Sequence, residues 1–197
     1  MFAPFVLAAL LQVAPVAPVA TPTSPPAPAT VKVVMTTTAG PITFALEKDR
    51  APVTTANFLR YVDAKRLDGI TFYRSMKLPW NAGLIQAGQR DMAKRYPPIA
   101  HEPTSKTGLT HTDGAISMAR LAPGTATADF SIVVGDMTGL DAKPDDPGFA
   151  VFGRVVEGMD VVKTIWNSPR SPTKGEGVMK GEMLEPPVRI LTVRRVP

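Results

Sequence analysis

Short runs of alternating apolar residues follow one another along most of this chain, and only two segments between them show helical spacing. Alternation with a period of two is typical of strands that bury one face. Consecutive strands without intervening helices disfavour a doubly wound parallel sheet and favour a closed antiparallel barrel with helices packed at its ends. The fold is therefore expected to be mainly β. The strand-like runs lie at residues 31–35, 42–46, 70–74, 84–86, 114–120, 129–134, 149–155 and 188–193.

The first helical segment is expected to begin at Pro52, because proline suits the first turn of a helix. Val53 and Phe58 belong to the apolar face that helical spacing predicts, and Gly69 can end the helix. The second helical segment, residues 157–166, is amphipathic. These two segments are the helices expected at the barrel ends.

The first 31 residues contain no Lys, Arg, Asp or Glu. Residues 5–13 are apolar and lead into Ala-Pro-Val repeats, which resembles the apolar core and cleavage region of a secretory signal, although no basic residue stands near Met1. Residues 1–20 are therefore expected to be a signal peptide, and residues 21–30 a proline-rich linker. The apolar run is too short to span a membrane comfortably, so we expect a periplasmic or secreted protein without stable membrane insertion. A disordered Ala/Pro-rich tail is the alternative.

Composition excludes several kinds of chemistry. The chain has 197 residues with no Cys and 2 His, which removes thiolate nucleophiles and Cys-based metal sites. His101-Glu102 and His111-x-Asp113 are expected to lie in surface turns rather than to bind metal, because no third histidine accompanies them. The net charge of +5 is mild and its bases are scattered, so nucleic acid is not an expected partner. We expect no metal and no cofactor.

Six segments of the chain resemble segments of the cyclophilin-type peptidyl-prolyl cis-trans isomerases, and they occur in the order found in that family. They are TTAGPITFALEKDRAPVTTANFLRYV, GITFYR, LIQAGQ, GAISMAR, ADFSIVVGD and FAVFGRVVEGMDVVKTI. The resemblance extends over roughly residues 34–193, and together with the N-terminal segment it suggests a bacterial, exported member. It implies a closed eight-stranded antiparallel β-barrel capped by two α-helices, formed by residues 31–197.

Arg74 matches the catalytic arginine of this family. Rotation about an Xaa–Pro bond faces a barrier of about 18–20 kcal/mol, which is set by amide resonance. In the twisted transition state the nitrogen carries a localised lone pair, so a donor aimed at it stabilises the transition state more than the planar ground state. A permanently charged guanidinium suits this task. Gln86 matches the neighbouring glutamine, which would hold the substrate carbonyl and orient the guanidinium.

The resemblance also implies a substrate groove, and the chain departs from the family within it. Ser131 stands where the family has a phenylalanine at the floor of the proline pocket, so a large apolar wall is lost. Tyr73 replaces the usual histidine before the arginine. Residues 75–83 are expected to form a loop longer than in the family, from which Trp80 could fold back to refill the pocket. The expected substrate-binding residues are Tyr73, Leu84, Met118, Ala119, Phe130, Ser131 and Phe149.

The function expected from this resemblance is acceleration of Xaa–Pro bond rotation in exported proteins during their folding. The expected partners are proline-containing polypeptides, and the protein is expected to be a monomer. The altered pocket leaves open an alternative, a catalytically weak or inactive peptide-binding or chaperone module on the same barrel. A third hypothesis is a structural envelope protein that is tethered by the proline-rich segment.

Overall fold

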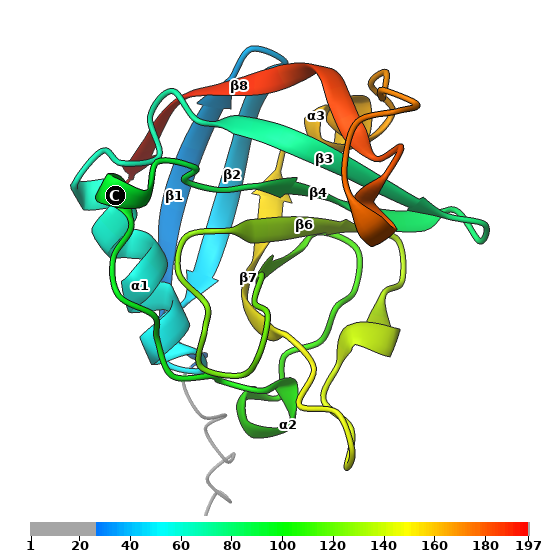
Figure 1. Ribbon diagram of the computed structural model, residues 1–197. Helices are drawn as coiled ribbons and strands as arrows, with labels where there is room; N and C mark the ends of the chain where they lie inside the picture. The colour runs from blue at the N-terminus through cyan, green and yellow to red at the C-terminus, as the bar shows by residue number, and fades with distance from the viewer. Residues whose placement is uncertain (1–26, 197) are drawn as a thin grey trace, which may run out of the picture.

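Successive strands pair edge to edge until the sheet closes on itself in the computed structural model, which describes residues 27–196. The strands of this part of the chain are β1 (Thr30–Thr37), β2 (Gly40–Glu47), β3 (Thr71–Leu78), β4 (Ala82–Ala87), β5 (Ala115–Met118), β6 (Phe130–Val134), β7 (Ala150–Glu157) and β8 (Met183–Arg195). Their order is β1-β2-β7-β5-β6-β4-β3-β8, every neighbouring pair is antiparallel, and β8 pairs with β1 (Figure 1). The predicted mainly β fold, a closed eight-stranded antiparallel barrel, is confirmed.

Two helices pack against the barrel, as predicted. α1 (Pro52–Asp63) and α3 (Met159–Trp166) lie on opposite sides of it in Figure 1. A third, one-turn helix, α2 (Thr104–Thr107), lies in the long connection between β4 and β5. Short 3-10 turns occupy Met92–Lys94, Thr138–Leu140 and Gly177–Met179.

α1 begins at Pro52 as predicted but ends at Asp63, well before Gly69. The chain turns away at Lys65, whose φ of 55° does not continue a right-handed helix. Val53 is exposed rather than buried, because Thr54 takes a buried position in the first turn.

Aromatic side chains fill the end of the barrel next to α1. The ring of Phe58, from α1, lies 5.2 Å from that of Phe130 and 5.4 Å from that of Phe152. Phe72 of β3 completes the group, 6.2 Å from Phe130. All four side chains are buried, and edge-to-face contacts between such rings add to the stabilisation that comes from burying their area. This packing fixes the faces of β3, β6 and β7 that point inward.

β3 and β4 form a hairpin, so the prediction of a loop over residues 75–83 was wrong. β3 continues to Leu78, which pairs with Ala82 at the start of β4. Only Pro79, Trp80 and Asn81 form the turn, which needs no more residues because Asn81 adopts a φ of 58°. Trp80 is 66% exposed at this turn and does not refill the pocket.

The N-terminal predictions fall mostly outside the described residues. The predicted signal peptide, residues 1–20, lies entirely outside them, and only the end of the linker lies within. β1 begins at Thr30, so the last predicted linker residue belongs to the barrel. Within residues 27–196, no helix is both long and apolar enough to cross a membrane.

Candidate active site

A β-bulge sets the direction of Arg74. On β3, Phe72 pairs with Ala87 and Arg74 pairs with Gln86, so Tyr73 is an extra residue between the two pairs. Simple alternation would place Phe72 and Arg74 on the same face of the sheet. The extra residue changes this: Phe72 is buried in the barrel, whereas both Tyr73 and Arg74 line a groove on the other face.

The guanidinium of Arg74 is held by two side chains. Its Nη1 donates to Oε1 of Gln86 at 2.9 Å, and its Nε donates to Oε2 of Glu182 at 2.7 Å. Nη2 lies 2.7 Å from the same Glu182 oxygen. Glu182 directly precedes β8, and its carbonyl oxygen accepts from the backbone N–H of Ser75, which keeps its carboxylate beside Arg74. Predicted neighbours Arg74 and Gln86 are therefore together, and Glu182 is a partner that the sequence did not reveal.

The groove beside Arg74 has a volume of about 660 Å³. Most of the predicted substrate-binding residues line it, on strands β3, β4, β5 and β6 and in the segment before β7. They are Tyr73, Leu84, Met118, Ala119, Ser131 and Phe149. The backbone N–H of Ala119 is already bonded to the carbonyl of Asp129 at 2.9 Å, so Ala119 can offer a peptide its carbonyl but not its N–H.

Phe130 does not line the groove, and its predicted contact with substrate was wrong. β6 alternates along its length, so when Phe130 points into the barrel the next residue, Ser131, points to the groove. Phe130 is fully buried between Phe58 and Phe72. Its contribution is therefore to the core that supports the site.

An ion-pair cluster forms the rim of the groove next to Tyr73. The Tyr73 hydroxyl donates to Oδ1 of Asp129 at 2.8 Å, and the guanidinium of Arg90 lies 4.8 Å from the centre of the Tyr73 ring. Arg90 and Arg95 lie 3.7 and 4.0 Å from carboxylate oxygens of Asp129. Burial, together with the negative charge of Asp129, raises the pKa of Tyr73, so its hydroxyl stays protonated.

Arg120 closes the opposite side of the groove. Its Nε donates to the carbonyl of Gly148 at 2.9 Å, and its guanidinium stacks 4.8 Å from the ring centre of Phe149. This stacking fixes Phe149 as one wall of the groove.

His111 lies at the base of the groove, not in the surface turn that the sequence predicted. It is fully buried, with Nδ1 at 2.6 Å from Oδ1 of Asp141 and Nε2 at 2.8 Å from Oγ of Ser117. A carboxylate cannot donate, so Nδ1 carries the proton and Nε2 accepts from Ser117. Burial lowers the pKa of His111, and the bond to Asp141 only partly opposes this. The Asp141 oxygen also accepts from the backbone N–H of His111, so the network anchors this loop.

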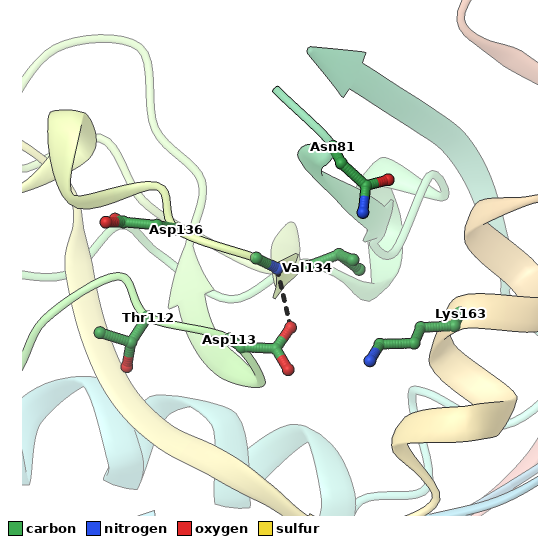
Figure 2. Close-up of a pocket in the computed structure, with 7 residues that line it drawn as sticks. Asn81, Thr112, Asp113, Val134, Asp136 and Lys163 are labelled. Carbon is green, nitrogen blue, oxygen red and sulfur yellow. Dashed lines mark hydrogen bonds between the residues drawn. The ribbon is translucent and has the colours of Figure 1, made fainter. Parts of the chain in front are cut away.

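A second hollow lies near the turn between β3 and β4 and has a different character (Figure 2). Its polar lining includes Asp113, which accepts from the backbone N–H of Gly135 at 2.7 Å, and Lys163, which extends toward it from α3. Nowhere in residues 27–196 do three or more Asp, Glu or His side chains gather as metal ligands would.

The site is thus a mostly apolar groove on the outer face of a closed barrel, with a fixed guanidinium at one edge. Comparison with known proteins identifies the family to which the chain belongs. The family model described as cyclophilin type peptidyl-prolyl cis-trans isomerase/CLD matches residues 32–195. The chain belongs to this family, whose activity is the cis–trans isomerisation of bonds to proline.

Bacterial relatives carry the same activity in their names. A peptidyl-prolyl cis-trans isomerase of Acinetobacter baylyi is 36% identical over 168 residues, which cover 84% of this chain and 86% of the relative. Peptidyl-prolyl cis-trans isomerase A of Dickeya dadantii is 38% identical over 138 residues, covering 68% and 70%. The crystal structure of a cyclophilin type isomerase from Cryptosporidium parvum has the same fold, with a TM-score of 0.70 at 19% identity over 86% of this chain and 99% of that one.

Proposed function

We propose that this peptidyl-prolyl isomerase acts on exported proteins as they fold, and that Arg74 accelerates the rotation by stabilising the twisted amide electrostatically. The observation that carries the mechanism is the placement of the guanidinium, fixed on one side by Gln86 and Glu182 and open to the groove on the other. The uncharged N-terminal segment supports export. Proline-containing polypeptides are the proposed partners, taken up by a monomer.

The arginine has donors to spare for a substrate. A guanidinium carries five N–H groups, and the contacts to Gln86 and Glu182 engage one each on Nε, Nη1 and Nη2. One N–H on each Nη remains for the lone pair of the twisted proline nitrogen. A charge-assisted hydrogen bond is worth about 1.5–3 kcal/mol, which corresponds to about one to two decades in rate. The apolar groove, which excludes water, supplies further stabilisation.

Gln86 has a second task in this mechanism. Its Oε1 accepts from Arg74, which orients the amide so that its NH₂ group can donate. That donor is suited to the carbonyl of the residue before proline, because this oxygen must be held while the proline side of the bond rotates. The apolar side chains of Leu84, Met118 and Phe149 form walls against which the proline ring packs.

The experiment that tests this function is an exchange measurement on a short Xaa–Pro peptide, by NMR or by a protease-coupled assay. Wild type should accelerate cis–trans exchange, and Arg74→Ala should remove most of the acceleration. Arg154→Ala is the matched control, since Arg154 is an exposed arginine of β7 that does not line the groove. Equal cis–trans exchange rates with Arg74→Ala and with wild type would contradict the mechanism. Mass spectrometry of the exported protein identifies its N-terminal residue, which tests the predicted signal cleavage.

A second candidate, a binding module with little catalysis, is favoured by one observation. Ser131 leaves the floor of the groove without the aromatic wall expected in the family. Under this hypothesis the protein binds Xaa–Pro peptides but leaves the rate of their cis–trans exchange unchanged. Titrating the peptide in the same NMR samples distinguishes the isomerase from the binding module. Chemical-shift changes report peptide binding, and cis–trans exchange cross-peaks report catalysis.

A further inference from the structure

The floor of the groove carries a hydroxyl group without a protein partner. Ser131 faces the groove from β6 and is only 9% exposed. No hydrogen bond among residues 27–196 engages its hydroxyl, and the oxygen is not sealed from the groove. A dry apolar ligand above it would leave this hydroxyl unpaired, which is unfavourable.

Ser131 belongs to a row of polar side chains that crosses three strands. It pairs directly with Gln86 on β4 and with Ser117 on β5. Directly opposed residues of antiparallel strands point to the same face, and all three side chains line the groove. His111 continues the row, since its Nε2 lies 2.8 Å from the Ser117 hydroxyl.

The other members of this row already have hydrogen-bond partners, although the NH₂ group of Gln86 remains free for the substrate carbonyl. Ser117 donates to His111, His111 donates to Asp141, and Gln86 accepts from Arg74. Ser131 therefore offers an open hydroxyl on the floor, beside the free NH₂ group of Gln86 that the proposed function assigns to the substrate carbonyl. Above this row, apolar side chains such as Leu84 of β4 and Met118 of β5 form much of the wall, and the charged side chains lie at the rim. Apolar walls above a polar floor fit a ring that is apolar at its edges and polar at its tip.

We propose that Ser131 makes this pocket selective for a pyrrolidine ring with a hydrogen-bonding substituent on its γ carbon, as in 4-hydroxyproline. The inference rests on the proposed function, because it concerns the ring seated beside Arg74. The γ carbon is the ring atom farthest from the peptide backbone, so it reaches deepest into the pocket. A substituent oxygen there meets the Ser131 hydroxyl, in space that a phenylalanine side chain would fill.

The test compares two peptides that differ only in proline or 4-hydroxyproline, with each hydroxyl epimer measured separately. For each peptide, kcat/KM is obtained from NMR exchange with wild type, Ser131→Ala and Ser131→Thr. In Ser131→Ala the ratio of hydroxyproline to proline kcat/KM should fall about threefold to tenfold for one epimer, which corresponds to one neutral hydrogen bond. Ser131→Thr, which keeps a hydroxyl, should retain part of the preference. Thermal melts establish that the variants are folded.

The outcomes separate this inference from the function on which it rests. Acceleration of the proline peptide with the same ratio in wild type and Ser131→Ala, for both epimers, overturns the inference and leaves the proposed function intact. Failure of wild type to accelerate either peptide contradicts both. Arg154→Ala, at an exposed site outside the groove, serves as the control and should keep the wild-type ratio.

Discussion

The carboxylate of Glu182 should be necessary for the full activity of Arg74. Its Oε2 lies 2.7 Å from both Nε and Nη2, so it fixes the plane of the guanidinium. Glu182→Gln keeps the size and one acceptor oxygen but removes the charge. The variant therefore tests how much of the arginine's effect depends on being held in place.

The size of the effect follows from the contact. The side chains of Arg74 and Glu182 are 14% and 18% exposed, so solvent screens the pair only in part. A charge-assisted hydrogen bond is worth about 1.5–3 kcal/mol and a neutral one about 0.5–1.5 kcal/mol. Glu182→Gln loses the difference between these two hydrogen-bond strengths, about 1 kcal/mol. The guanidinium of Arg74 is then held less firmly in the enzyme–peptide complex, and a loss of this size corresponds to about a fivefold slower reaction. The loss should appear in kcat, with little change in KM.

NMR exchange at several peptide concentrations gives kcat and KM separately for Glu182→Gln, Glu182→Ala and wild type. Glu157→Gln is the matched control, since Glu157 is exposed at the end of β7 and does not line the groove. An unchanged or raised kcat in Glu182→Gln would show that the carboxylate does not support catalysis by Arg74. That result would refute the positioning argument.

Two further predictions concern stability. Glu102 is 4% exposed and accepts from the backbone N–H groups of Val53 and Thr54 and from the Thr54 hydroxyl, at 2.6 to 3.1 Å, so Glu102→Ala should lower the free energy of unfolding by about 2–4 kcal/mol in urea titrations. If Glu102→Ala lowers the free energy of unfolding by less than Glu157→Ala does, Glu102 does not cap the N-terminus of α1 as these bonds indicate. Burial lowers the pKa of His111 in the folded protein, so the unfolded chain binds the proton first as pH falls below about 6.5. Stability should therefore decrease from pH 8 to pH 5, and His111→Gln should show a weaker decrease; equal pH profiles would count against this assignment.

The barrel was predictable because strands that bury alternate residues, β1 and β2 most clearly, leave a period-two pattern, and further short apolar runs follow them without intervening helices. Arg74 and Gln86 were predictable as neighbours because both stand in recognisable segments. Their direct pairing across β3 and β4 confirms that they lie together. Ser131 was recognised as a departure for the same reason.

The remaining parts of the site depend on contacts that leave no local pattern. Glu182 meets Arg74 across 108 positions of chain, in a segment without periodicity. The bulge at Tyr73 decides which face Arg74 takes, and nothing in the alternation of residues 70–74 marks it. The prediction placed both Phe130 and Ser131 in the groove, but consecutive residues of a strand point to opposite faces, so only Ser131 lines it. His111 looked like a turn residue because its partner Asp141 lies 30 positions away.

The central claim is that Arg74 stabilises the twisted amide more than it binds the peptide. The most direct measurement is NMR exchange on a saturating Xaa–Pro peptide, with the dissociation constant determined in the same titration, for wild type and Arg74→Ala. If Arg74 acts on the transition state, the catalysed exchange rate of Arg74→Ala falls by about one to two decades, while its dissociation constant changes by much less. An equal loss in affinity, or an exchange rate that stays at the wild-type value, would contradict the central claim.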